Sequence, residues 1–238
     1  MSAVAIWHDV ECGAYTADLP LWEELSSRAD GAVLDLGCGT GRVAIHLARR
    51  GFTVVGLDVD PDLVAALAER AEGLPLQPLL ADARGFELDT DIALALAPMQ
   101  LIQLLSGSAD RRACLSCIAA RLLPGGRIAL AIVERLPEPD GDAPPLPDVR
   151  EVEGWVYSSL PVDSAEGDGE IAIRRLRQTV SPAGALSEER NEIRIRTLPA
   201  EQLEREGEEV GLVALGRHAI PPTDLHVGST VVVLGRAE

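Results

Sequence analysis

Residues 33–41, with the sequence VLDLGCGTG, constrain the fold of this chain more than any other segment. An apolar stretch contains one acid, Asp35, and ends in three glycines at alternate positions. Glycine lets the chain turn sharply and lets a ligand lie against bare backbone. A helical pattern follows at residues 42–50, and a second acid, Asp58, lies 17 residues beyond Gly41. A strand, a glycine turn and a helix in this order predict a nucleotide-binding site.

Strand and helix patterns alternate up to residue 133. Short apolar segments bounded by Gly, Pro or Asp are typical of strands that are buried on both faces of a parallel sheet. Asp60 and Pro61 predict the start of a helix, as its N-cap and its first residue. Repeated strand–helix units predict a Rossmann-like, doubly wound α/β sheet. The expected strands are residues 32–36, 53–58, 77–81, 92–97 and 127–133.

The pattern changes after residue 136. A connection rich in Pro and Asp leads to strand patterns at residues 152–160, 170–180 and 191–198, which predict a small antiparallel β insertion after the fifth strand. A helix at 200–210 and strands at 212–219 and 229–234 then follow. We predict an N-terminal lid and helix (1–30), a main domain (31–136 and 200–238) and the insertion (137–199). The insertion serves either as a substrate cap or as the surface of a homodimer.

The composition narrows the classes of function. The 238 residues carry a net charge of −17, which disfavours a nucleic acid partner because such partners are usually held by clustered cations. All 21 basic residues are arginine, so a catalytic or phosphate-loop lysine is excluded. No membrane span or signal peptide is visible, and we expect a cytoplasmic protein. Cys114 and Cys117 are i, i+3 on an expected helix, and we predict buried thiols and no metal site.

The chemistry of the two acids indicates which nucleotide is bound. The glycine spacing is GxGxG, and Arg42 occupies the position of the last glycine in the dinucleotide fingerprint. Asp35, beside the glycine turn, would repel a phosphate and attract an ammonium group. Asp58 suits a ribose diol, since a carboxylate can accept both hydroxyl protons. S-adenosylmethionine has a ribose, a positively charged tail and no phosphate, and it fits both acids.

Four motifs, VLDLGCGTG, GLDVD, LLADARGF and LLPGGRIAL, strongly resemble those of the class I S-adenosylmethionine-dependent methyltransferases. The resemblance covers nearly the whole chain and implies a seven-stranded sheet with an antiparallel last strand. It places the glycine turn under the methionine end of the cofactor, Asp58 on the ribose, and Val59 and Asp82 at the adenine. The cofactor-binding residues that it implies are Asp35, Gly37, Cys38, Gly39, Asp58, Val59, Asp82, Ala83, Ala97 and Met99.

The aromatic residues point to the acceptor site. The chain has three Trp, two Tyr and two Phe, and five of these seven lie in the N-terminal segment and the insertion. We expect the N-terminal segment to cover the cofactor and the insertion to shape the acceptor site. Trp22 is expected to pack the helix at 19–27 on the sheet. Tyr15 is the best lid residue, because its hydroxyl can donate or accept a hydrogen bond near the transferred methyl.

Tyr15 and Glu134 are therefore the catalytic candidates, and Trp7, Gln100 and Trp155 are the expected substrate contacts. His218 and His226 are expected to be solvated turn residues. The predicted function is methyl transfer to an amine or hydroxyl of a small metabolite or natural-product intermediate. A looser resemblance to small-molecule N-methyltransferases supports it. Two alternatives stay open: a catalytically silent S-adenosylmethionine-binding regulator or scaffold, and a peptide or protein methyltransferase.

Overall fold

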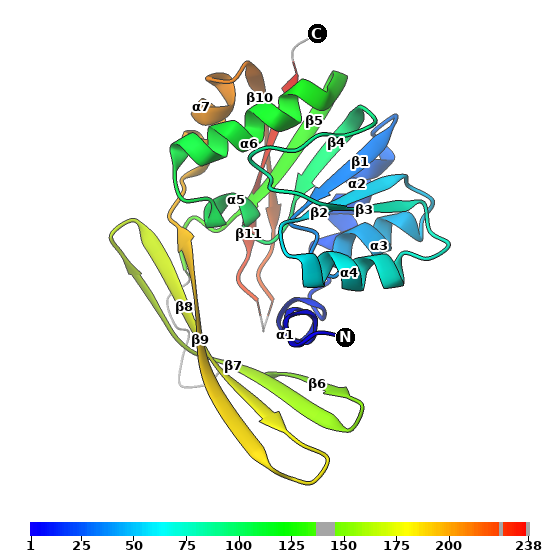
Figure 1. Cartoon of the computed structure of the whole chain (residues 1–238). Coiled ribbons are helices and arrows are strands. Elements are labelled where there is room, and N and C mark those ends of the chain that lie inside the picture. Colours follow the sequence, from blue (N-terminus) through cyan, green and yellow to red (C-terminus); the bar gives the residue numbers. More distant parts are fainter. Residues whose placement is uncertain (137–145, 224–225, 237–238) are drawn as a thin grey trace.

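A seven-stranded sheet forms the centre of the main domain (Figure 1). The computed structural model describes residues 1–136, 146–223 and 226–236. The strand order is β10-β11-β5-β4-β1-β2-β3. Strands β1 to β5 run parallel to one another, and β11 is antiparallel to both β5 and β10. The predicted sheet with an antiparallel last strand is confirmed. The strands are β1 (Ala32–Leu36), β2 (Val54–Asp58), β3 (Leu76–Leu80), β4 (Ile92–Ala97), β5 (Leu122–Ile132), β10 (Leu212–Ile220) and β11 (Ser229–Arg236).

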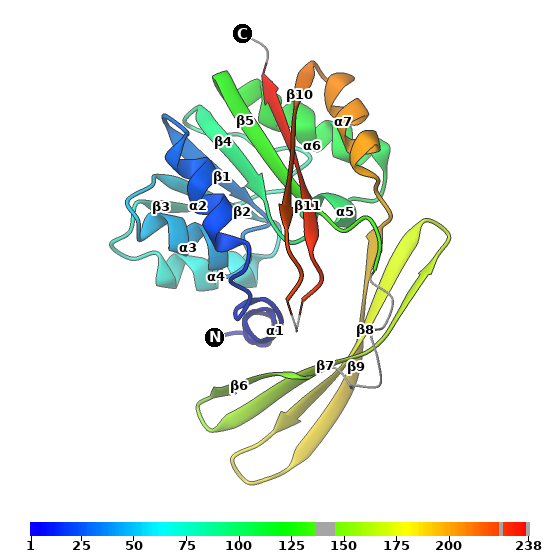
Figure 2. The same ribbon diagram turned by 180° about the vertical axis from the view of Figure 1, so that it is seen from behind.

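Helices cover both faces of this sheet, as expected when its strands are buried on both sides (Figure 2). Leu34 and Leu36 point into a core that contains Ile102 and Leu115. Val33 points to the opposite face, into a second core that contains Trp22. The predicted packing of Trp22 is therefore confirmed. The helices are α1 (Ala3–Cys12), α2 (Leu19–Ser27), α3 (Arg42–Ala48), α4 (Pro61–Arg70), α5 (Leu101–Leu104), α6 (Ser108–Arg121) and α7 (Ala200–Glu208).

A separate four-stranded antiparallel sheet follows β5, in the order β6-β7-β8-β9. Its strands are β6 (Asp148–Val152), β7 (Trp155–Gly167), β8 (Glu170–Val180) and β9 (Leu186–Arg196). The pattern at 152–160, predicted as one strand, is split by a tight turn at Glu153 and Gly154. Both residues have positive φ, 52° and 80°, as in the two-residue turns that join antiparallel strands.

Helix α1, which the sequence patterns did not identify, lies between the two sheets (Figure 1). Asp9 pairs with Arg70 of α4 at 2.6 Å and with Arg150 of β6 at 3.1 Å. Glu11 pairs with Arg177 of β8 at 2.7 Å. The helix is therefore anchored by ion pairs to both parts of the protein.

No helix among the described residues is long and apolar enough to cross a membrane.

A buried ion pair joins α6 to α7, and its loss should destabilise the fold. Arg111 donates two hydrogen bonds, of 2.7 and 2.6 Å, to Glu206, and both side chains are at most 5% exposed. Arg111→Met leaves a buried carboxylate without its cation. We expect a loss of about 3–5 kcal/mol in the free energy of unfolding, measured by urea denaturation. Arg28→Met, which breaks the exposed pair with Glu24, should cost less than about 1 kcal/mol. Equal losses in the two variants would show that burial does not make the Arg111–Glu206 pair more important to the fold.

Candidate active site

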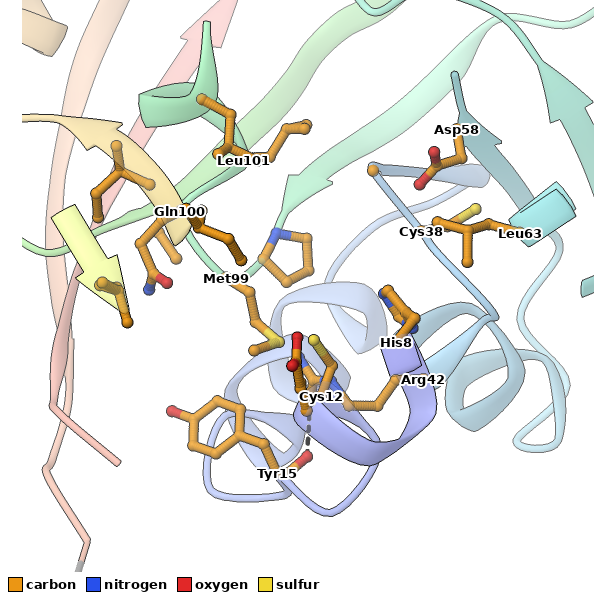
Figure 3. A pocket seen from close by; sticks show the side chains of 18 of the residues that line it. His8, Cys12, Tyr15, Cys38, Arg42, Asp58, Leu63, Met99, Gln100 and Leu101 are labelled. Atoms are coloured by element: carbon orange, nitrogen blue, oxygen red, sulfur yellow. Dashed lines mark hydrogen bonds between the residues drawn. The ribbon is translucent and has the colours of Figure 1, made fainter. Parts of the chain in front are cut away.

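A cavity of about 1440 Å³ lies between the carboxyl ends of the parallel strands, helix α1 and the four-stranded sheet (Figure 3). Pockets for a single small ligand are usually about 300–1,000 Å³. The cavity therefore has room for a cofactor and a second molecule. Eleven of the predicted site residues line it: Trp7, Tyr15, Asp35, Gly37, Cys38, Asp58, Val59, Asp82, Ala83, Met99 and Gln100.

The glycine turn forms one wall of the cavity. Gly39 has a φ of +55°, and a Cβ at this position would lie 2.1 Å from Nε2 of His8. His8 of α1 thus rests directly on the turn, and its Nδ1 lies 3.2 Å from the Thr40 hydroxyl. Burial lowers the pKa of His8, so its imidazole is neutral at neutral pH. Only glycine allows this approach of α1 to the turn.

The Asp35 carboxylate lies behind the turn in an unusual environment. The residue is 1% exposed, and neither of its oxygens has a well-formed hydrogen bond among the described residues, although the Arg42 charge and the backbone N–H of Ala44 partly favour its ionised form. Burial raises the pKa of Asp35 to about 7. An unpaired buried carboxylate is costly, and a positively charged group in the cavity would relieve that cost.

Asp58 and Val59 lie at the tip of β2. The Asp58 carboxylate accepts hydrogen bonds from the backbone N–H groups of Gly39 and Asp60, at 2.9 and 3.0 Å. This fixes the carboxylate beside the turn while leaving lone pairs for further donors. Val59 is 67% exposed, so it offers an apolar surface at the cavity. Asp82 pairs with Arg84 at 2.6 Å, and this contact lowers the pKa of Asp82 to about 2.

The chain following β4 is strained where it meets the cavity. Met99 and Gln100 have positive φ values of 50° and 64°, which residues other than glycine rarely adopt. The Gln100 amide donates to the Ser229 hydroxyl at 3.3 Å, which ties this turn to β11. Strain of this kind persists where the surrounding structure holds it, and it is common at functional sites.

A family model described as a methyltransferase domain matches residues 33–126, which include the glycine turn and the tips of β2 and β4. Residues 33–126 are a methyltransferase domain.

The curated relatives include methyltransferases of a ribosomal protein and of an amino sugar. The ribosomal protein L11 methyltransferase of Cupriavidus metallidurans is 33% identical over 141 residues, which are 57% of this chain and 44% of that protein. The chain spans less than half the length of the L11 methyltransferases that it matches. The dTDP-3-amino-3,6-dideoxy-alpha-D-glucopyranose N,N-dimethyltransferase of Streptomyces fradiae is 28% identical over 197 residues, which are 82% of this chain and 75% of that protein.

Solved structures share the fold over the full chain. CalS10, an amino pentose methyltransferase from Micromonospora echinaspora with bound S-adenosylmethionine, has a TM-score of 0.74 at 20% identity, covering 98% of this chain and 97% of that chain. The sugar N-methyltransferase KedS8 from Streptoalloteichus has a TM-score of 0.71 at 20% identity, covering 100% and 88%. This chain therefore shares its fold with these two structures over nearly its whole length.

Tyr15, in the connection between α1 and α2, lines the cavity. The residue is 7% exposed, and its ring packs on His226 at a centroid distance of 4.6 Å. The Arg42 guanidinium lies 5.1 Å from the ring centroid and donates to the Tyr15 carbonyl at 2.9 Å. Arg42 also forms two hydrogen bonds to Asp18, at 2.6 and 2.7 Å. In Figure 3, Tyr15 and Gln100 lie on the side of the pocket opposite Asp58.

The inserted sheet presents one face to the methyltransferase domain. Trp7 of α1 makes an edge contact with Tyr157 of β7, with ring centroids 5.3 Å apart. The Arg177 guanidinium lies 5.0 Å from the Trp7 ring. Ile173 and Ile193, which pair across β8 and β9, also line the cavity. The sheet thus contributes directly to the wall opposite the glycine turn.

Several predicted site residues lie outside the cavity lining. Glu134 accepts hydrogen bonds from the backbone N–H of Ala200, at the start of α7, and from the Thr230 hydroxyl, at 3.0 and 3.1 Å. These contacts give Glu134 a structural role. Trp155 lies at the β6–β7 turn and is 41% exposed. Gly39 and Ala97 are not among the residues that line the cavity.

His226 lines the cavity although the sequence did not predict it as a site residue. The sequence predicts a solvated turn residue at this position, but His226 packs on Tyr15 and lines the cavity. Its contact with Tyr15 joins opposite ends of the chain, so no local pattern could reveal it.

Cys114 is buried, and Cys117 is half-buried on α6. Among the described residues, no group of three or more His, Cys, Asp or Glu side chains is placed to hold a metal ion.

The raised pKa of Asp35 predicts a pH effect on the ligand-free protein. Between about pH 4 and pH 7, Asp35 stays protonated in the folded state but is ionised in the unfolded state. Its contribution to the stability of the fold is therefore full below about pH 4 and is lost as the pH rises through 7. Asp35→Asn removes the titration. When the pH is raised from 5.5 to 8.5, the wild type should lose about 2 kcal/mol more in its free energy of unfolding than the variant, as measured by urea denaturation. The exposed control Asp89→Asn should show no such gain, and a parallel pH profile for Asp35→Asn would refute the prediction.

Proposed function

We propose that this protein transfers a methyl group from S-adenosylmethionine to an amine of a small molecule. The observation that carries this proposal is the buried Asp35 carboxylate, which lacks a well-formed hydrogen bond among the described residues and lies against a cavity with room for two ligands. An ammonium group is the natural partner for such a carboxylate. The Streptomyces fradiae relative and the neighbours CalS10 and KedS8, whose names refer to amino sugars or sugar N-methylation, support an amine acceptor.

The residues of the cavity fit the cofactor. Asp35 would hold the amino group of its methionine end, and the turn at Gly37 and Cys38 would pass beneath it. Asp58, already oriented by two backbone donors, would accept from the ribose hydroxyls. Val59 and Ala83 would contact the adenine. When bound, the cofactor supplies a methyl group activated by its sulfonium.

The protein's own contribution to the reaction is positioning. A neutral amine needs no strong base to attack an activated methyl, only alignment and a later outlet for its proton. Such alignment can supply roughly 7–11 kcal/mol. Tyr15 and Gln100 lie on the acceptor side of the cavity, where each can hold an amine by a hydrogen bond. The inserted sheet acts as a cap over this side, and Ile173, which lines the cavity, supports that role.

Calorimetric titration tests the cofactor site first. We expect S-adenosylmethionine and its demethylated product to bind the wild type, and methyl transfer to follow with an amine panel. Absence of binding by both compounds would refute the proposal. Binding without turnover on amines, phenols, sugars and peptides would instead favour a silent regulator or scaffold. Turnover on peptides alone would favour a protein methyltransferase.

Asp35→Asn should weaken the binding of S-adenosylmethionine by about 10- to 100-fold, because a contact to a charged partner contributes about 1.5–3 kcal/mol. The exposed variant Asp89→Asn carries the same charge change and should bind like the wild type. Equal affinities for all three proteins would show that Asp35 does not hold the cofactor.

Tyr15→Phe should lower kcat on the order of 10- to 100-fold while leaving cofactor affinity within about twofold, if the hydroxyl acts on the reacting groups. Tyr157→Phe is the matched control, because it removes the other tyrosine hydroxyl of the chain. Tyr157 does not line the cavity, so its variant should retain activity. Unchanged turnover in Tyr15→Phe would eliminate this role.

A further inference from the structure

We infer that the methyl acceptor is an amine on a phosphate-free scaffold with an apolar body, such as an amino sugar already attached to its aglycone, and not a nucleotide-activated sugar. This inference rests on the proposed function and names the class of its substrate. The inference depends on two features of the cavity: the charges of the residues that line it and the apolar side chains on one of its walls. A nucleoside diphosphate needs cations, and Arg is the residue best suited to hold one.

Four arginines line the cavity, and two of them flank the cofactor end. Arg42 forms two hydrogen bonds to Asp18, whose carboxylate also accepts from the Trp22 indole at 2.8 Å. Arg84 pairs with Asp82 at 2.6 Å and with Asp110 at 3.3 Å. Neither guanidinium offers an unpaired charge to a second ligand.

The other two arginines lie on the inserted sheet. Arg175 pairs with Asp148 at 2.9 Å, and both side chains are less than 20% exposed. Arg177 donates two hydrogen bonds to Glu11, at 2.7 and 2.9 Å. All four arginines of the lining are therefore neutralised by carboxylates within the described part of the chain.

Carboxylates outnumber arginines around the cavity. Eight Asp or Glu residues line it against four Arg, so the lining has four more acids than cations. A diphosphate would enter a site of its own sign, whereas an amine in its protonated form would be drawn in.

The acceptor side of the cavity is apolar. Leu104 of α5, Val162 of β7 and Ile193 of β9 line it and are 52%, 49% and 37% exposed. Exposed apolar side chains gathered at one site mark a surface that a ligand or partner covers. An aglycone supplies such a surface, and a nucleoside diphosphate does not. A glycosyl transfer, which releases the nucleoside diphosphate, must then precede the methylation.

Two probes test the substrate class by calorimetric titration of protein saturated with S-adenosylhomocysteine. Thymidine diphosphate represents the nucleotide, and the octyl glycoside of 3-amino-3,6-dideoxyglucose represents an amino sugar on an apolar body. We expect saturable binding of the glycoside only, with no binding of the diphosphate up to about 5 mM. Diphosphate binding with a Kd below about 100 μM, or failure of the glycoside to bind, would overturn the inference. Failure of the proposed function would appear earlier, as absent binding of S-adenosylhomocysteine.

A variant tests the charge argument itself. Asp148→Asn leaves Arg175 without its carboxylate at the edge of the cavity, so thymidine diphosphate should bind at least about five-fold more tightly than to the wild type. Asp168→Asn is the control, because it makes the same charge change at an exposed turn of the same sheet. Asp168 has a φ of 53°, which Asn tolerates. Equal diphosphate affinity in the two variants would overturn the inference.

Discussion

The ion pairs of helix α1 hold the two sheets of this protein around one cavity. Asp9 reaches α4 and β6, and Glu11 reaches β8. Next to these anchors, His8 rests on the glycine turn, which only a residue without a Cβ allows. Helix α1 thus contacts both the turn and the inserted sheet. A change that loosens α1 alters the cofactor wall and the acceptor wall together, although the two come from distant parts of the chain.

Charged groups are distributed unevenly around this cavity. The arginines of the lining each have a carboxylate partner, while Asp35 is buried without a well-formed hydrogen bond among the described residues. A cation is therefore favoured beside the turn. On the proposed function, the excess of acids in the lining would disfavour competing anions. The same arrangement would orient a cofactor with a cationic tail and select against phosphate in the second ligand.

The main sheet could be predicted from sequence because each of its strands carries a local signal. β1, β4 and α2 have the predicted bounds, since apolar runs and flanking Gly, Pro or Asp define them. Helix α1 lacked such a signal, because its buried Asp9 is satisfied only by residues far along the chain. β6 was missed because a Glu-Gly turn with positive φ at both residues is an uncommon sequence for that conformation.

The residues expected to hold the cofactor could be grouped from sequence for the same reason, and the residues that surround the rest of the cavity could not. Asp35, Asp58 and the glycines lie within a single strand–turn–helix unit and at the next strand tip, so their spacing alone brings them together. Tyr15 and His226 meet only because the segment between α1 and α2 and the β10–β11 hairpin converge on one cavity. Glu134 leaves the site because α7 begins beside it and its N–H groups attract the carboxylate. If the proposed acceptor class is correct, acceptor choice would depend on tertiary contacts, chiefly the ion pairs of Arg175 and Arg177 on the inserted sheet.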